Sequence, residues 1–197
     1  MIIVVRHGQT DANARRLLLG RADPPLSGVG REQAYAVAEV LGHEDRPVAV
    51  FSSPLRRARE TAACIADVFA LDVEDETAMI EIDYGEWDER PLADVPRDVW
   101  LAWRNDVDFA PPGGESLRAV QHRVSACMER VTERAGDGSI VVVSHVSPIK
   151  AAALWALGLD GRPELAWRLQ LDLASVTRIA TGPLGPVLSG FNQRPHP

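Results

Sequence analysis

Cysteine is scarce in this chain, and it has no long apolar run. The 197 residues include two cysteines, Cys64 and Cys127, which lie far apart on the apolar faces of expected helices. We expect both to be reduced, with a disulfide or a metal site as the alternatives. No apolar run approaches the roughly 20 residues that a membrane-spanning helix needs. The first strand-like run, Ile2 to Val5, follows no basic leader, so we expect no signal peptide and a cytoplasmic protein.

Positive charge is also in short supply. The chain has 21 Lys and Arg against 28 Asp and Glu, which gives a formal net charge of -7. An acidic chain argues against binding to nucleic acid or to an anionic membrane. An anionic substrate would therefore need a local cluster of positive charge. Hydrophobic residues make up 46% of the chain and charged residues 25%, which suits a single globular domain over residues 1–197.

The apolar patterning predicts that strands and helices alternate. Runs that suit buried strands occur at Ile2–Val5, at Val48–Phe51, in a stretch ending near Ile82, and at Ile140–Val143. Helical spacing follows start signals at Ser27, Ser53-Pro54, Ser116 and Ser147-Pro148. The segment from Trp167 to Phe191 suggests two or three further strands. Together these features predict an α/β fold, a three-layer α/β/α sandwich around a mostly parallel sheet.

Residues 86 to 114 interrupt this pattern. They are rich in Trp, Pro and Asp, and we expect them to form an irregular, lid-like insertion. Trp87, Trp100 and Trp103 could line a substrate cleft or could pack the insertion onto the sheet. The sequence leaves both interpretations open.

Two of the expected strands end in a histidine. Arg6-His7-Gly8 follows the first strand, and Ser144-His145 follows the strand at Ile140–Val143. Ligands of α/β folds bind at the carboxyl ends of the strands, so the two histidines can face each other there. The helix near Ser53-Pro54 adds three arginines, Arg56, Arg57 and Arg59. Arginine and histidine donors around one point suit a phosphoryl group and need no metal ion.

Six ordered segments make the sequence similar to the histidine phosphatase superfamily, which is also called phosphoglycerate mutase-like. They are RHGQT at Arg6–Thr10, GRADPPLS at Gly20–Ser27, SSPLRRA at Ser52–Ala58, EIDYGEW at Glu81–Trp87, GGES at Gly113–Ser116 and VSH at Val143–His145. One such motif would be a weak signal, but six in the family's order are not explained by chance. The short chain resembles the compact phosphatase branch, which includes broad-specificity and α-ribazole-phosphate phosphatases.

The resemblance implies a mechanism without metal or cofactor that passes through a phosphohistidine. His7 would be the nucleophile, and Glu81 would be the general acid and then the general base. Arg6, Arg57 and His145 would hold the phosphoryl oxygens and stabilise charge in the transition state. Three further groups would complete the pocket: Asn13, the backbone N–H of Gly20 and the backbone N–H of Val146. The expected partner is a small phosphorylated substrate. A homodimer is left open, and neither nucleic acid nor a membrane is expected.

Three positions depart from the family pattern. Val146-Ser147 stands in place of the frequent Gly-Gly, so side-chain bulk borders the pocket. Glu60 replaces a common glutamine, a change that we expect to matter little. Asp88-Glu89 replaces the common Glu-Gly at a point where substrate would enter, and it leaves the identity of the substrate undetermined.

The sequence favours a phosphatase over a 2,3-bisphosphoglycerate-dependent phosphoglycerate mutase. Residues 86 to 108 contain seven acidic and three basic side chains, and a lid with that balance should repel a polyanion. The family's mutases carry a longer insertion with extra Lys and Arg. A catalytically inactive, phosphate-binding relative is the second alternative. The expected catalytic set is nevertheless complete: His7, Glu81, Arg6, Arg57 and His145.

Overall fold

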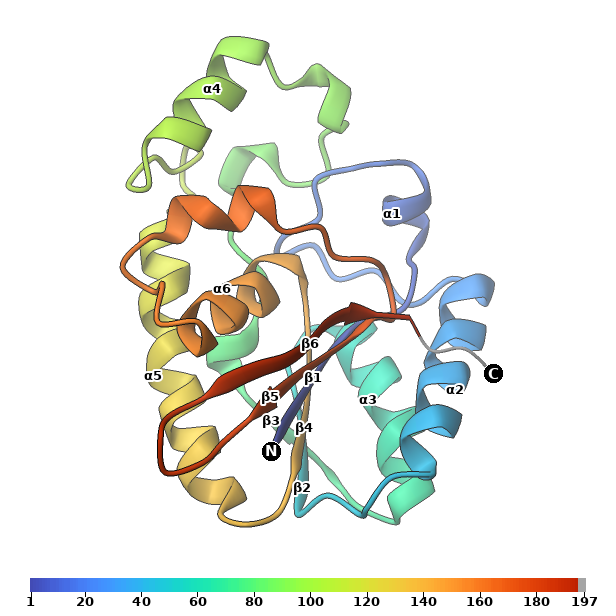
Figure 1. Ribbon diagram of the computed structural model, residues 1–197. Coiled ribbons are helices and arrows are strands. Elements are labelled where there is room, and N and C mark those ends of the chain that lie inside the picture. Colours follow the sequence, from blue (N-terminus) through green and yellow to red (C-terminus); the bar gives the residue numbers. More distant parts are fainter. Residues whose placement is uncertain (195–197) are drawn as a thin grey trace.

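A six-stranded sheet forms the centre of the computed structural model, which describes residues 1–194 (Figure 1). The strands are β1 (Ile2–Arg6), β2 (Ala49–Ser52), β3 (Val73–Asp75), β4 (Ile140–Ser144), β5 (Val176–Ala180) and β6 (Val187–Gln193), in the order β3-β2-β4-β1-β5-β6. The first four strands in this order run parallel, whereas β5 and β6 form an antiparallel pair beside β1. The α/β prediction with a mostly parallel sheet is therefore confirmed.

Helices cover both faces of the sheet. They are α1 (Asp11–Ala14), α2 (Gly28–Gly42), α3 (Arg56–Phe69), α4 (Arg97–Asn105), α5 (Leu117–Ala135) and α6 (Val146–Ala156). Successive side chains of a strand point to opposite faces, and in β1 Ile2 and Val4 join the core under α5 and α6. Ile3 and Val5 join the core under α2 and α3. This alternation produces the three predicted layers. None of the helices in residues 1–194 has the length and apolar character to cross a bilayer.

The inserted segment is more ordered than its sequence suggests. It contains α4 and two short 3-10 helices, Gly85–Trp87 and Leu92–Asp94, so the prediction of an irregular region is wrong in this respect. Trp103 is 2% exposed, and its ring stacks on that of Trp100 with 5.5 Å between centroids. Trp167 meets both rings edge to face. Trp100 and Trp103 therefore pack the insertion onto the domain, which decides between the two interpretations of these residues.

Two helix starts differ from the sequence prediction. Ser53 does not cap α3, because the helix begins at Arg56 and Leu55 makes no side-chain cap bond. The capping group is Asp23, whose carboxylate accepts the backbone N–H of Arg56 at 2.6 Å. Helix α6 begins at Val146 rather than after Ser147. A cap that comes from a distant loop leaves no local sequence signal. The sequence therefore predicts Ser53, the nearest capping residue before the helix.

The predicted strand ending near Ile82 is also wrong. Strand β3 ends at Asp75, and a 3-10 helix, Thr77–Met79, follows it. The backbone N–H of Ile82 bonds to the side chain of Glu81 at 2.8 Å instead of joining the sheet. Both cysteines are free, as expected, with Cys127 buried and Cys64 half-buried.

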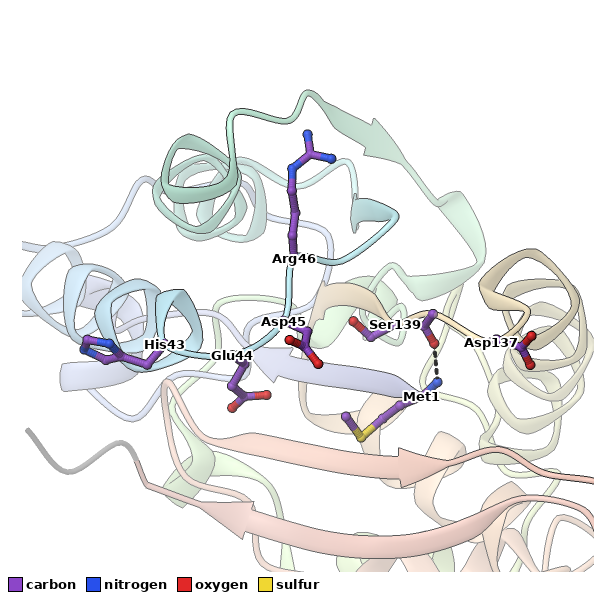
Figure 2. Close-up of a pocket in the computed structure, with 8 residues that line it drawn as sticks. Met1, His43, Glu44, Asp45, Arg46, Asp137 and Ser139 are labelled. Carbon is purple, nitrogen blue, oxygen red and sulfur yellow. Dashed lines mark hydrogen bonds between the residues drawn. The ribbon is translucent and has the colours of Figure 1, made fainter.

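A hollow of about 500 Å³ lies at the amino ends of the parallel strands (Figure 2). Its lining includes Met1, Glu44, Asp45, Arg46 and Asp137. The amino group of Met1 donates to the carbonyl of Gly138 at 2.6 Å. Ligands of such sheets bind at the opposite, carboxyl ends, and the paired histidines are found there.

The α3 cap can be tested through stability. Asp23→Ala should lower the free energy of unfolding by about 1 kcal/mol, the usual loss for an N-cap carboxylate, and Asp23→Asn should restore most of it. Asp45→Ala is the matched control, since Asp45 is also exposed and accepts no side-chain bond in the described residues. Denaturant titrations that place Asp23→Ala level with the control would contradict this role.

Candidate active site

The two predicted histidines meet at the carboxyl ends of β1 and β4. These strands are direct neighbours, with Arg6 in register with Ser144. His7 and His145 are the next residues along each strand, and their ring centroids are 5.0 Å apart. His7 is 3% exposed and His145 is fully buried. The sheet alone therefore brings together two residues that are 138 positions apart in the sequence (145 − 7).

Each imidazole ring has one nitrogen bonded and one nitrogen free. The Nδ1 of His7 lies 2.6 Å from the carbonyl of Gly8. A carbonyl only accepts, so this contact assigns the proton to Nδ1 and leaves a lone pair on Nε2. The Nε2 of His145 lies 2.7 Å from the hydroxyl of Ser53, while its buried Nδ1 has no partner.

One fully buried and one half-buried guanidinium group supply positive charge beside the histidines. Arg57 is fully buried and donates to the carbonyls of Ala22 at 2.8 Å and Gly20 at 2.9 Å. Arg6 donates to the carbonyl of Leu171 at 2.7 Å. The Nε of each arginine is buried without a partner, and neither side chain forms an ion pair within residues 1–194. Such unpaired cations suit an anionic ligand.

The surroundings shift the protonation of all four groups. Burial, followed by the charges of Arg57 and Arg6, lowers the pKa of His7 well below its usual value. The pKa of His145 is lowered in the same way, by burial first and then by Arg57. Burial also lowers the pKa of Arg6 to about 10 and lowers that of Arg57. At neutral pH the site therefore holds two neutral imidazoles and two charged guanidinium groups.

Asp88 holds the loop that receives Arg57. Its carboxylate accepts the backbone N–H groups of Gly20 and Ala22, each at 2.7 Å. The carbonyls of the same two residues accept from Arg57, so the loop bridges Asp88 and the guanidinium. Asp88 thus faces this loop, although its place in the sequence suggested substrate entry. The N–H of Gly20, expected to bind phosphate, is bonded to Asp88, and its predicted role stays a prediction.

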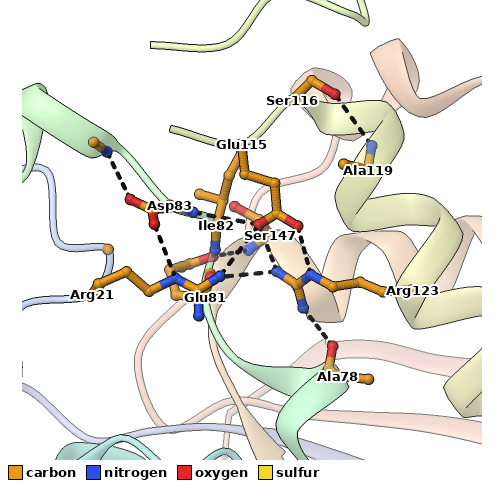
Figure 3. A network of polar contacts seen from close by, with 12 residues as sticks. Arg21, Ala78, Glu81, Ile82, Asp83, Glu115, Ser116, Ala119, Arg123 and Ser147 are labelled. Carbon is orange, nitrogen blue, oxygen red and sulfur yellow. Dashed lines mark hydrogen bonds and ion pairs between the residues drawn. The ribbon is translucent and has the colours of Figure 1, made fainter. Parts of the chain in front are cut away.

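Glu81 is 4% exposed and binds the start of α6 (Figure 3). Its carboxylate accepts three backbone N–H groups, those of Ile82 at 2.8 Å, Val146 at 3.1 Å and Ser147 at 3.1 Å. A helix N-terminus attracts negative charge, and here a carboxylate of the protein occupies it. The N–H of Val146 is therefore also bonded, and its role in binding phosphate stays a prediction.

An ionic network holds the backbone around Glu81 in place (Figure 3). Arg123 of α5 donates to the carbonyls of Glu81 at 3.3 Å and of Ala78. The carboxylate of Glu115 holds that guanidinium at 2.8 and 3.0 Å. Arg21 lies 3.6 Å from the same carboxylate. This network joins the loop at residue 21 to α5 through the GGES turn.

A pocket of about 350 Å³ opens above these groups. Five of the predicted site residues line it: Arg6, His7, Asn13, Glu81 and Val146. Val146 thus borders the pocket, as expected. The Oδ1 of Asn13 accepts from Thr10 in a capping box at the start of α1. Arg57 and His145 are fully buried and are not among the residues that line the pocket.

The sequence pattern of the histidine phosphatase superfamily (branch 1) matches residues 2–194. This chain belongs to that superfamily. A mycobacterial glucosyl-3-phosphoglycerate phosphatase in complex with VO3 has the same fold, with a TM-score of 0.88 and 31% identity over 98% of each chain. The family assignment from the six motifs is therefore confirmed.

Curated relatives of this chain differ in length and name. Phosphoserine phosphatase 1 of Hydrogenobacter thermophilus is 38% identical over 81% of this chain and 77% of its own length. A bifunctional protein of Mycobacterium tuberculosis is 39% identical over 89% of this chain. That match covers 49% of the relative, so the chain spans about half the length of that protein.

Several residues of the site could not be found from the sequence. The Ser53-Pro54 pair predicts a helix cap at Ser53, yet the Ser53 hydroxyl contacts His145. Glu60 accepts the backbone N–H of Leu26 at 3.0 Å and so holds the GRADPPLS loop, although we expected its identity to matter little. Tyr84 lines the pocket, and the sequence predicts no role for it beyond its place in the EIDYGEW motif. The sequence spacing does not predict the ion pair between Glu115 and Arg123, because Glu115 lies in a turn and Arg123 in the helix that follows it.

The neutral histidines predict a dependence of stability on pH. The unfolded chain binds protons on histidine near pH 6.5, whereas His7 and His145 in the folded chain bind them only at much lower pH. The unfolded state therefore holds more protons below about pH 6.5, and the free energy of unfolding should fall as the pH drops from 6.5 toward 5. His7→Asn and His145→Asn should each reduce this slope.

Imidazole C–H chemical shifts measure the same property directly. The signals of His7 and His145, assigned with the two variants, should keep their neutral values well below pH 6.5. Midpoints near 6.5 for both rings would contradict the effect of burial and of the two arginines.

Proposed function

We propose that this chain hydrolyses phosphomonoesters through a phosphohistidine on His7, as a histidine-type acid phosphatase. The observation that carries the proposal is the state of His7: its Nδ1 is fixed by Gly8, and its Nε2 carries a free lone pair. A neutral imidazole beside Arg6 and Arg57 is a nucleophile placed next to an anion site. No metal or cofactor is required in this proposal, since the two arginines supply the positive charge.

In the first step the Nε2 of His7 attacks phosphorus and the bond to the leaving oxygen breaks. Glu81 acts as the general acid and gives a proton to that oxygen, and an alcohol departs. In the second step the Glu81 carboxylate takes a proton from water, and the resulting hydroxide attacks phosphorus. The P–N bond breaks, phosphate leaves and His7 is neutral again. Glu81 lines the same pocket as His7, which supports this assignment.

The phosphoryl oxygens need donors on several sides. We assign this role to Arg6 and Arg57, whose Nε atoms have no protein partner, and to His145, whose Nδ1 is likewise free. Asn13 lines the pocket and adds a side-chain amide. The N–H groups of Gly20 and Val146 would join this set only after the bonds to Asp88 and Glu81 rearrange.

Hydrolysis is favoured over mutase activity by the charge of the inserted segment. Its seven acidic side chains against three arginines between residues 86 and 108 would repel a bisphosphorylated sugar acid. Relatives named phosphoserine phosphatase and glucosyl-3-phosphoglycerate phosphatase support the same choice. A 2,3-bisphosphoglycerate-dependent mutase remains the second candidate, because it would use the same His7 chemistry. An inactive phosphate-binding relative is disfavoured by the complete set of five catalytic residues.

The same proposal covers the organisation of the protein. We propose one histidine phosphatase domain over residues 1–197 with a lid-like insertion at about 86–114. Residues 195–197 of this domain lie outside the described structure. The packing of α4 against Trp167 supports a lid that is joined to the domain. A cytoplasmic location is part of this proposal, and a homodimer is left open by it.

Purified protein should release phosphate from 4-nitrophenyl phosphate after exhaustive EDTA treatment. His7→Ala should reduce the rate to background, and Glu81→Gln should reduce kcat roughly a hundredfold, a typical general acid–base contribution. His122→Ala is the control, because His122 is exposed on α5 and does not line the pocket. Wild-type turnover in His7→Ala would rule the mechanism out.

A coupled assay with 3-phosphoglycerate and enolase separates the two candidates. We expect phosphate release to exceed isomerisation by a wide margin, with or without 2,3-bisphosphoglycerate. Fast, bisphosphate-dependent formation of 2-phosphoglycerate with negligible phosphate release would identify a mutase instead.

A further inference from the structure

The pocket above His7 has a polar floor and a wall whose apolar part is formed by leucines. Arg6, His7 and Glu81 belong to the floor. Six of the residues that line the pocket are leucines: Leu17, Leu18, Leu19, Leu92, Leu171 and Leu173. Leu92 is 40% exposed, and Leu17 and Leu173 are half-buried. Apolar surface that stays open to water beside a reactive group is a binding surface for an apolar ligand.

The leucine wall is held in place by backbone hydrogen bonds. Leu18 donates to the carbonyl of Arg90 at 2.8 Å and accepts from the N–H of Glu89 at 2.8 Å. Leu92 donates to the carbonyl of Arg16 at 3.0 Å, which fixes the segment before Leu17 to the inserted segment. These bonds join two segments that are far apart in the sequence. The wall therefore exists before a ligand arrives, which reduces the entropy lost on binding.

Leu171 connects the wall to the floor. Its carbonyl accepts the Nη1 of Arg6 at 2.7 Å, and its side chain is 7% exposed. A phosphoryl group held by Arg6 would thus have Leu171 as a neighbour. The carbon chain of the substrate would extend along the leucine wall from this point.

The charged groups of the rim offer little to a polar leaving group. The carboxylate of Asp172 is engaged by Arg194 at 2.9 Å and by Asn192 at 3.2 Å. Arg16 is exposed, and an ion pair with an exposed arginine contributes little in water.

We propose that the leaving group is an apolar alcohol, so that the substrate class is alkyl or aralkyl phosphate monoesters rather than phosphorylated amino acids or sugar acids. This inference rests on the proposed phosphatase activity and adds the part of the substrate that the leucine wall selects. Phosphate is recognised by the floor, and the carbon chain is recognised by the wall.

A series of n-alkyl phosphates from ethyl to hexyl tests the wall. The leaving alcohols have nearly equal acidity, so differences in kcat/KM report contacts with the chain. We expect kcat/KM to rise roughly two- to fourfold per methylene group until the pocket is filled. The upper limit corresponds to the free energy of transferring one CH2 out of water. n-Butyl phosphate should exceed O-phosphoserine by more than tenfold.

Variants assign the effect to the wall. Leu92→Ser and Leu17→Ser, checked for folding by circular dichroism, should halve the slope per methylene or reduce it further. Leu101→Ser is the matched control, since Leu101 is 49% exposed on α4 and does not line the pocket; it should keep the wild-type slope. A flat or falling series with phosphate release intact would overturn the apolar specificity and leave the phosphatase proposal standing. No release from any ester, 4-nitrophenyl phosphate included, would overturn both.

Discussion

Two guanidinium groups, one fully buried and one half-buried, lie in the site without a carboxylate ion pair, and the site depends on this constraint. Burying a charge is costly unless hydrogen bonds replace water. In this structure backbone carbonyls provide part of that replacement, two for Arg57 and one for Arg6. No ion pair neutralises the positive charge, and burial together with this charge keeps the neighbouring histidines neutral. An anion that enters the pocket would supply the missing negative charge, which is how a fold of net charge -7 can bind phosphate.

Carboxylates act on this centre through the backbone. Asp88 holds the N–H groups of the loop whose carbonyls hold Arg57. Glu81 is held in turn by three N–H groups, two of them at the start of α6. Each carboxylate thus satisfies backbone donors instead of neutralising an arginine. A direct ion pair would have filled the anion site, and this arrangement keeps it available.

Sequence patterns that depend on nearby residues predicted the structure well. The helix predicted to start at Ser116 is α5, which Ser116 caps, and the two strand-end histidines meet because adjacent parallel strands end together. Contacts between distant segments were not predictable. Asp23 caps α3 from another loop, and Asp88 binds a loop 68 residues away. A side chain in a turn has several backbone partners within reach, and only the packed fold selects one of them.

The position of phosphate on His7 tests the central claim most directly. The Glu81→Gln variant should accumulate the intermediate, because it lacks the base for the second step. The variant can be mixed with 4-nitrophenyl phosphate, denatured in alkali and digested, and 31P NMR can then identify the phosphorylated ring nitrogen. The structure predicts phosphate on the Nε2 of His7, since the Nδ1 is bonded to Gly8. Phosphate on Nδ1, on another residue, or no base-stable phosphate at all would contradict the account.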